Sequence, residues 1–327
     1  MASLKDVAER AGVSPSTVSY FLNGKKKVRP ETEERIMEAV SELKYRPNLV
    51  ARSLKMKSSR SAGIIVSDLS NIFFLDVLAG IESVLAEAGY SSIVSNSRGS
   101  EETERENLRD LTNRNIDGVI LLGTGGHTAF PEECAGIPVV SVDRIGDVKT
   151  NTISVDNRRG GYIGARYLLQ KNRTNIIFIG FPNRISLHER YEGCIDACRE
   201  CGLDPREHLQ YVDTGISPEH GCAAVMDLYA QGKLKGCDAI FAGADYIAFG
   251  ILKALRELGI SVPDEIGVMG FDDLPLSQYV TPTLTTVQQP RFEMGQQAAS
   301  MLLRRMESPD TSDTVLLEPA LVVRESV

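Results

Sequence analysis

The chain has 327 residues, 42% of them apolar and 24% charged, which is typical of a globular protein and excludes a disordered or fibrous one. At roughly 100–200 residues per domain, this length predicts two or three domains. No apolar run approaches the ~18–20 residues that a membrane-spanning helix needs, and the first residues, Met1–Asp6, do not resemble a signal peptide. We therefore expect a cytoplasmic protein with no membrane partner.

The net charge of −8 is unevenly divided along the chain. Residues 1–60 carry 13 Lys and Arg against 7 Asp and Glu, a net charge of +6, and the rest of the chain carries 23 against 37, a net charge of −14. A compact basic segment ahead of an acidic body is typical of a head that binds a polyanion. A flexible basic tail would have the same composition, so the residue pattern must decide between the two.

The basic segment has the pattern of three short helices. Ser3 and Asp6 form a capping-box pair ahead of the first helix, and Ser14 followed by Pro15 opens the second. Gly12 lies in the turn between them, and a third apolar-faced helix follows. Two short helices joined by a glycine-containing turn, with a third helix as support, are typical of a helix-turn-helix, whose second helix enters the major groove of DNA. A generic three-helix bundle is the alternative that the pattern alone leaves open.

Two long stretches, LKDVA through SYFLNG (Leu4–Gly24) and YRPNLVARSL (Tyr45–Leu54), resemble the headpiece and the hinge helix of the lactose-repressor family of transcription factors. The resemblance continues to about residue 324. It implies an all-α helix-turn-helix headpiece over residues 1–46, a hinge helix and linker over 47–60, and an α/β two-lobed, periplasmic-binding-protein-like core with parallel sheets over 61–327. It also implies a homodimer that binds double-stranded operator DNA and a small-molecule effector.

In that family the hinge segment folds only on the operator and inserts a leucine into the minor groove, and Leu54 matches this leucine. An eight-residue helix is marginal alone in water, and basic neighbours with an apolar wedge can offset its ordering on kinked DNA. The alternative is an ordinary linker in which Leu54 packs on the core. The residues expected at DNA are Pro15, Ser16, Thr17, Ser19, Tyr20, Asn23, Lys26, Arg52, Leu54 and Lys55.

Two positions of the headpiece, 20 and 29, depart from the family pattern. Tyr20 stands where many relatives carry arginine, so a bidentate contact to guanine is lost, and Pro15 has no side-chain hydrogen bond to offer a base. The operator sequence therefore does not carry over from relatives. Arg29 precedes Pro30 where the family commonly has a serine N-cap, and we expect some loss of local stability there.

From residue 62 onward, short apolar strands alternate with helices, which predicts parallel sheets covered on both faces. About 265 residues exceed what one core usually holds, so we expect two lobes. The family resemblance implies that the chain crosses between the lobes near residues 157, 289 and 318. The expected strands are 63–66, 92–95, 118–122, 138–142, 176–179, 239–242 and 266–269.

Polar side chains follow the ends of these strands, where the ligand crevice of an open parallel sheet lies. Carboxylates, guanidinium groups and an aromatic face together suit a hydroxylated or heterocyclic small molecule. By the resemblance, Arg190 grips the effector and Asp272 accepts hydrogen bonds from it. The other expected effector-binding residues are Phe73, Phe74, Asp143, Arg184, Ser186 and Asp245.

The class of effector is not settled by this pattern. A sugar or sugar derivative is favoured, but Ala244 replaces an asparagine of some sugar-responsive relatives, and the chain has no tryptophan to stack on a sugar ring. Nucleobases, nucleosides, sugar phosphates and sugar acids stay open. Whether the effector releases DNA or promotes its binding stays open as well.

No cofactor, metal or catalytic residue is expected. Cys194, Cys198 and Cys201 have the C-x3-C-x2-C spacing of an iron–sulfur motif, but they lie on one face of a predicted helix, and packing into the core is the simpler interpretation. Two other classes remain. One is a solute receptor with a vestigial head, which the missing export signal disfavours. The other is an α/β enzyme, for which Asp143 and Asp272 are the only candidate pair.

Overall fold

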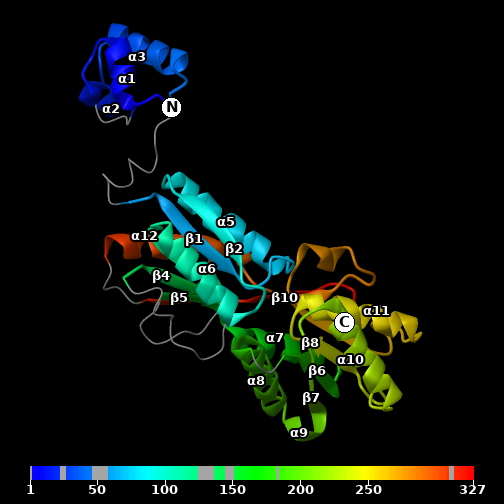
Figure 1. The fold of residues 1–327 in the computed structure, drawn as a ribbon. Helices are drawn as coiled ribbons and strands as arrows, with labels where there is room; N and C mark the ends of the chain where they lie inside the picture. The colour runs from blue at the N-terminus through cyan, green and yellow to red at the C-terminus, as the bar shows by residue number, and fades with distance from the viewer. Residues whose placement is uncertain are drawn as a thin grey trace. The chain divides into compact units, whose positions relative to one another are not determined.

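The computed structural model describes most of the chain. The contacts between its residues divide the chain into two compact units, Met1–Ser59 and Arg60–Val327 (Figure 1). The described residues are 2–22, 27–45, 58–123, 136–143, 151–181, 184–308 and 313–327. Among these residues, no helix is both long enough and apolar enough to span a membrane.

The first unit is a bundle of three helices, α1 (Leu4–Ala11), α2 (Pro15–Leu22) and α3 (Pro30–Glu42). As predicted, Ser3 and Asp6 form a capping box at the start of α1, and Gly12 ends the helix with a φ of 66°. Arg29 precedes α3 and makes no side-chain capping bond. The buried core consists of Val7, Ala8, Ala11, Val18, Ile36 and Ala39.

The second unit contains two six-stranded sheets, and each sheet with its helices is a lobe. The N-lobe is built from strands β1 (Ser61–Val66), β2 (Ser91–Asn96), β3 (Gly118–Leu122), β4 (Val139–Val142), β5 (Asn151–Val155) and β11 (Thr314–Leu317), with helices α5 (Phe73–Glu87), α6 (Glu101–Asn113) and α12 (Arg291–Glu307). Its strand order is β11-β5-β4-β3-β1-β2, and every neighbouring pair is parallel.

The C-lobe repeats this plan. It is built from strands β6 (Ile176–Gly180), β7 (Leu209–Asp213), β8 (Ala239–Ala242), β9 (Gly267–Asp272), β10 (Thr285–Gln288) and β12 (Ala320–Val322), with helices α7 (Asn157–Gln170), α8 (Ile185–Glu200), α9 (Pro205–His208), α10 (Pro218–Ala230), α11 (Asp245–Glu257) and the 3-10 turn η2 (Pro275–Gln278). Its strand order is β12-β10-β9-β8-β6-β7, and only β12 is antiparallel to its neighbour. The predicted two-lobed α/β fold with parallel sheets is confirmed.

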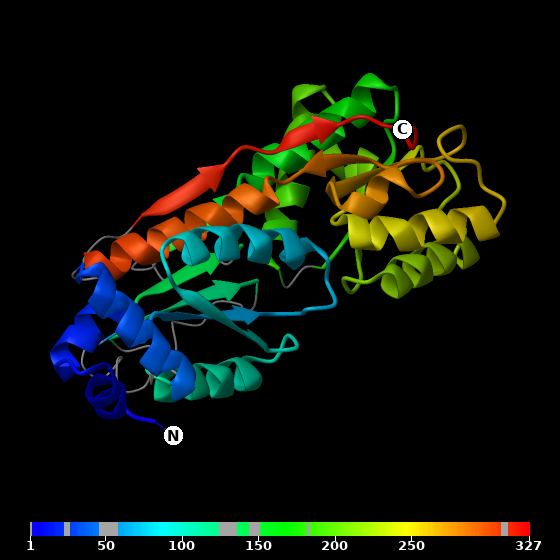
Figure 2. The same ribbon diagram turned by 90° about the horizontal axis from the view of Figure 1, so that it is seen from above.

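The chain crosses between the lobes at three places, where the family resemblance implies them. The crossings lie between β5 and α7, between β10 and α12, and between β11 and β12. Figure 2 shows the last crossing, where the C-terminal segment in red runs from one lobe to the other. Because α12 belongs to the N-lobe by its packing on α5, the residues just before it join the two lobes.

Every strand expected from the sequence is present, but β5, β7, β10, β11 and β12 were not predicted. Strands β5 and β10 are buried yet polar, with the sequences NTISV and TTVQ. The hydroxyl groups of their threonines have hydrogen-bond partners inside the protein. The hydroxyls of Thr152 and Ser141 form a hydrogen bond of 2.9 Å, and the hydroxyl of Thr286 donates to the carboxylate of Asp245. Strands β7, β11 and β12 are sheet edges and half-exposed, so they lack a continuous apolar run.

Helices α5 and α12 touch backbone to backbone through two glycines. A Cβ on Gly80 would lie 2.1 Å from the carbonyl oxygen of Phe292, and one on Gly295 would lie 2.1 Å from that of Val77. No side chain fits at either position, so the two helices are held as one closely packed pair.

The cysteine cluster is largely part of the C-lobe core. Cys194 and Cys198 are fully buried among apolar residues, and burial raises the pKa of both thiols. Cys201, at the end of α8, is exposed, so core packing accounts for two of the three cysteines. Among the described residues, no group of His, Cys, Asp and Glu side chains has the arrangement of a metal site.

Candidate functional site

The exposed face of α2 carries the described part of the expected DNA contacts. Pro15, Ser16 and Tyr20 are exposed, and Thr17 and Ser19 are half-buried, whereas Val18 on the opposite face is fully buried. The hydroxyl of Ser14 accepts from the backbone N–H of Thr17 and contacts the hydroxyls of Ser16 and Thr17 at 2.8 Å each. These polar groups gather at the N-terminus of α2, where a helix favours an anion such as phosphate.

Five of the residues expected at DNA lie outside the described residues: Asn23, Lys26, Arg52, Leu54 and Lys55. The predicted hinge helix falls on the same part of the chain. Their roles stay predictions.

Arg190 is the centre of the C-lobe end of the cleft. It projects from α8 and is only 2% exposed. Its Nε donates to Oδ1 of Asn157 at 2.8 Å, and its Nη1 donates to the carbonyl of Gly243 at 2.5 Å. The guanidinium lies flat on the ring of Phe271, 3.7 Å from its centroid, and 3.7 Å from Oδ1 of Asp272. The protein thus holds this cation in a fixed orientation before any ligand arrives.

Asp272 ends strand β9 in a strained backbone conformation, with a φ of 125°. Its side chain is 8% exposed, and its Oδ1 accepts from Nε2 of Gln289 at 2.6 Å. Burial raises the pKa of Asp272 to about 7, against the opposing effect of Arg190, and the neighbouring charge of Asp245 adds to the rise. A carboxyl group that changes protonation near neutral pH therefore stands beside the buried arginine.

Asp143 approaches this group from the N-lobe, directly after β4. Burial raises the pKa of its carboxyl group, and the charges of Arg190 and then Arg184 oppose the rise. Its Oδ1 is buried and has no hydrogen-bond partner among the residues that the structure describes. Glu189 lies nearby, and burial and the charge of Asp143 raise its pKa. Three carboxyl groups and two guanidinium groups thus converge where the lobes face each other.

The remaining expected residues have different positions. Arg184 is the half-buried N-cap of α8 and Ser186 is buried in its first turn, both beside the cleft end of β6. Phe73 and Phe74 are 5% and 3% exposed and pack edge to face within the N-lobe core. A Cβ on Gly123 would touch the Phe74 ring, so this ring closes the core beneath the ends of the strands.

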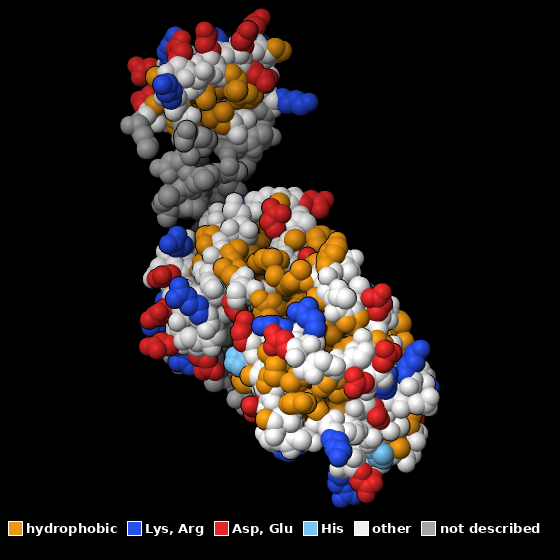
Figure 3. Space-filling model, turned by 90° about the vertical axis from the view of Figure 1, so that its right-hand side faces the viewer, with side chains coloured by type: hydrophobic (Ala, Val, Ile, Leu, Met, Phe, Trp, Pro, Cys, Tyr) orange, Lys and Arg blue, Asp and Glu red, His pale blue; other side chains and the backbone are white. Residues whose placement is uncertain are grey.

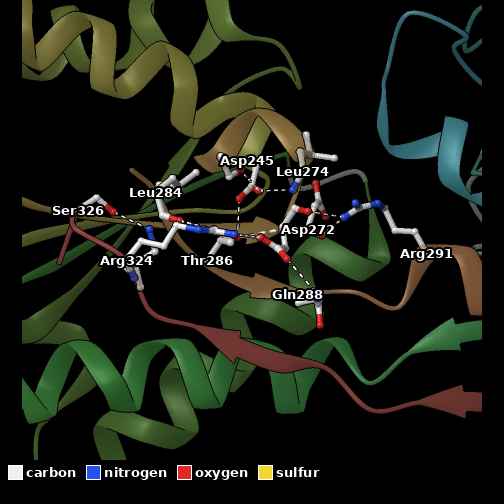
Figure 4. A network of polar contacts seen from close by, with 12 residues as sticks. Asp245, Asp272, Leu274, Leu284, Thr286, Gln288, Arg291, Arg324 and Ser326 are labelled. Atoms are coloured by element: carbon white, nitrogen blue, oxygen red, sulfur yellow. Dashed lines mark hydrogen bonds and ion pairs between the residues drawn. The ribbon is translucent and has the colours of Figure 1, made fainter. Parts of the chain in front are cut away.

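Asp245 differs from the expectation, because its carboxylate is already used by the protein. Its Oδ2 accepts from the backbone N–H of Leu274 at 2.8 Å and from the hydroxyl of Ser277 at 2.6 Å, and its Oδ1 accepts from Thr286 at 2.5 Å (Figure 4). It is fully buried. Asp245 therefore holds the segment after β9 against β10, and in this structure it has little capacity left for an effector.

Two buried polar residues at strand ends were missed by the sequence analysis. Ser67 directly follows β1 and Gln289 directly follows β10; they are 1% and 2% exposed. The hydroxyl of Ser67 and Oε1 of Gln289 bond to no described residue, as with Oδ1 of Asp143. The rule that selected Asp143, a polar residue after a strand, applies to Ser67 as well. Gln289 could not be found in this way because β10 itself was not predicted.

Comparisons with known proteins agree along the whole chain. The family described as "Bacterial regulatory proteins, lacI family" matches residues 3–48, and a "Periplasmic binding protein-like domain" matches residues 165–327. The ribose operon repressor of Haemophilus influenzae is 32% identical over all of this chain and 99% of its own. The HTH-type transcriptional repressor PurR of Vibrio campbellii is 33% identical over the same shares of the two chains.

Solved structures show the same likeness. The lac repressor dimer bound to operator and the anti-inducer ONPF is similar with a TM-score of 0.87 and 26% identity, covering 99% of this chain and 98% of that one. A LacI family transcriptional regulator from Enterococcus faecium with bound ribose has a TM-score of 0.73 and 28% identity, covering 82% of this chain and 98% of that one. With its three-helix head and its two-lobed core, the chain belongs to the lacI family of bacterial regulatory proteins.

Proposed function

We propose that this protein is a cytoplasmic transcriptional repressor that binds operator DNA as a homodimer and carries a sugar or sugar derivative between the two lobes of its body. The observation that carries the proposal is a set of three buried oxygens, on Ser67, Asp143 and Gln289, that bond to no described residue, and each of these residues directly follows a strand. Buried polar atoms in native proteins are almost always hydrogen-bonded, so such a set points to a ligand that supplies donors.

Several hydroxyl groups on a compact scaffold match this set of acceptors. Arg190 and the Asp272–Gln289 pair add a fixed cation and a second acceptor at the C-lobe side. Ring stacking is less available, because Phe73 and Phe74 are buried in the core and Arg190 covers one face of Phe271. A planar nucleobase therefore has less support than a sugar.

The names of the relatives include a sugar-responsive class and keep the alternative open. A ribose operon repressor and structures with ribose or cellobiose are among the similar proteins, and so are several repressors named PurR. The first experiment is a thermal-shift screen of the full chain with ribose, cellobiose, other sugars, sugar phosphates, sugar acids and nucleobases. A sugar that raises the melting temperature supports the proposal. A shift by nucleobases alone would replace sugar with nucleobase as the effector class.

Two variants tie any shift to the cleft. Asp143→Asn should remove most of the ligand-induced shift and leave the fold intact, because Oδ1 of Asp143 bonds to no described residue whose hydrogen bond would be lost. Arg190→Ala should remove it as well. A full shift in Asp143→Asn would place the ligand elsewhere. No catalytic step belongs to this proposal, and turnover of the bound sugar would contradict it.

DNA binding is tested on duplexes selected from a random pool by the full chain. Tyr20→Ala on α2 should weaken binding, whereas Met37→Ala on α3, with an equally exposed side chain, should not. Affinity should fall steeply with salt because lysine and arginine contacts to phosphate release counterions. Leu54→Ala should weaken operator binding and spare effector binding, and unchanged operator affinity would refute the wedge role.

Homodimer formation has an exposed apolar surface to support it. Hydrophobic side chains gather on one face of the body and extend over both lobes (Figure 3). The large hydrophobic residues exposed on the body include Leu75, Leu276, Tyr279 and Phe292, between 47% and 76% exposed. Exposed apolar area of this kind is typical of a surface that a second copy covers. A monomer at micromolar concentration in sedimentation equilibrium would contradict this part of the proposal.

A further inference from the structure

The end of β9 is connected to the N-lobe through one arginine. Arg291 is the first residue of α12 and is 9% exposed. Its Nη1 donates to the backbone carbonyls of Asp272 and Asp273, the latter at 2.9 Å (Figure 4). Its Nε and Nη2 donate to Oδ2 of Asp76 in the first turn of α5, at 3.0 and 2.7 Å. One planar guanidinium thus joins the turn that carries the cleft carboxyl group of Asp272 to a helix of the other lobe.

The Asp272–Asp273 turn is held firmly on its other side. Both residues have positive φ, 125° and 54°, which side-chain-bearing residues adopt only when their surroundings impose it. Oδ1 of Asp273 accepts from Nη2 of Arg324 at 2.6 Å, and its Oδ2 accepts from Nε2 of Gln288 at 2.8 Å. The turn has few ways to relax within the C-lobe, so a ligand that moves Asp272 also moves the two carbonyls that Arg291 grips.

Helix α5 extends from this contact to the point where the chain enters the body. Its C-cap is Ala88, whose carbonyl accepts from Nη1 of Arg60 at 3.2 Å. The guanidinium of Arg60 also lies over the ring of Tyr90, 5.0 Å from its centroid. Arg60 is the first residue of the second unit, directly after the segment that leads from the helix-turn-helix head. The close packing of α5 on α12 through Gly80 and Gly295 leaves the helix little freedom to bend.

We propose that α5 is a rigid connection between the Asp272–Asp273 turn and Arg60, and that Arg291 is the positioning residue that joins the turn to this helix. A displacement of the turn reaches Asp76 through Arg291, moves α5 as one body and arrives at Arg60. The use of this connection to regulate DNA binding rests on the function proposed above. The connection itself does not, and it is tested without effector or DNA.

The test is hydrogen exchange measured by mass spectrometry on the full chain. Asp76→Asn removes the charge that Arg291 grips, and Glu82→Gln, an exposed carboxyl group on the same helix, is the matched control. Asp76→Asn should speed exchange about threefold or more both at 272–274 and at 88–91 together with 60–62, because local openings of coupled segments rise together. The control should leave both segments unchanged. An effect confined to 73–77 would overturn the proposal.

A reciprocal variant separates coupling from local packing. Coupling between two sites is symmetric, so Arg60→Gln, at an exposed position, should speed exchange at 272–274 as well as at 88–91. Asp76→Glu keeps the charge and should restore protection at both ends. No response at 272–274 in Arg60→Gln, or no rescue by Asp76→Glu at 60–62, would refute the connection. Failure of the wild-type chain to bind any selected duplex would refute the proposed function. The hydrogen-exchange result would still decide whether the connection exists.

Discussion

The two lobes share one strand order but use their strand ends in opposite ways. In the C-lobe, Arg190, Asp245 and Asp272 all contact other protein groups at the end of the sheet, and one oxygen there, Oε1 of Gln289, is buried without a partner among the described residues. In the N-lobe, Ser67 and Asp143 each have a buried oxygen that bonds to no described residue. The polar groups of the C-lobe are therefore held largely by one another, and those of the N-lobe are less fully bonded. Substitutions in the C-lobe should affect stability as well as binding, and those in the N-lobe mainly binding.

The largest effect is expected for Arg190→Ala. It leaves Asp272 without its cation and removes donors from Asn157 and the Gly243 carbonyl, and breaking a buried charge pair in this way costs about 3–5 kcal/mol of unfolding free energy. Urea unfolding of the body measures it. Arg158→Ala is the control on the neighbouring helix, because the Arg158–Asp196 pair is exposed to solvent and its loss should cost much less. Equal costs would mean that the C-lobe site is not pre-formed.

Asp245→Ala should follow in size. It leaves the N–H of Leu274 and the hydroxyls of Ser277 and Thr286 without their acceptor in a buried site, which costs about 3 kcal/mol in total. The matched N-lobe change is Asp68→Ala, where the carboxylate after β1 accepts from Ser70 in an exposed loop. We expect a small loss there in the same urea measurement. A C-lobe variant as stable as the N-lobe one would contradict the assignment of Asp245 to structure.

A smaller, pH-dependent effect is expected from Asp272. Because the folded pKa of about 7 lies above the ordinary value of 3.8, the folded chain holds this proton more tightly than the unfolded chain. The contribution of Asp272 to stability is present in full below pH 4 and is lost as the pH rises through 7. The melting temperature of the wild type, relative to Asp272→Asn, should therefore fall between pH 5 and pH 8. A constant difference over this range would show that Asp272 is ionised throughout.

The smallest effect on stability is expected for Asp143→Asn. The carboxyl group has an oxygen that bonds to no described residue, and burial already disfavours its charge, so the amide should change the unfolding free energy less than Arg190→Ala or Asp245→Ala does. The same variant should lose most of its effector affinity in calorimetry. A variant that is strongly destabilised yet binds normally would reverse the roles of the two lobes.

The sequence predicts the apolar strands of both sheets well. Continuous apolar runs such as Gly118–Leu122 mark them, and Asp143 directly follows one such strand, β4. Prediction fails where a buried strand is polar. The residues TTV of β10 are buried, and Thr285 and Thr286 bond to Ser326 and Asp245, each 41 residues away, so neither the strand nor Gln289 after it stands out locally.

Contacts between distant parts of the chain limit the prediction in a second way. Asp245 has the position of an effector ligand, but its three donors lie 29, 32 and 41 residues further on. Arg291 has no local sign of its role either, because its carboxylate partner Asp76 is 215 residues away. The position of a residue after a strand predicts where its side chain lies. It does not predict which distant residues of the same chain already form hydrogen bonds or ion pairs with that side chain.

The triple crossing of the chain also has a consequence for its synthesis. The N-lobe begins with β1 at Ser61, but α12 and β11 reach it only after the entire parallel part of the C-lobe sheet has been made. The edge strands β11 and β12 lie within residues 314–322, and each completes a different lobe. On the ribosome neither lobe can therefore finish folding before the other, and a nascent chain interrupted before residue 314 exposes an unfinished sheet edge in both.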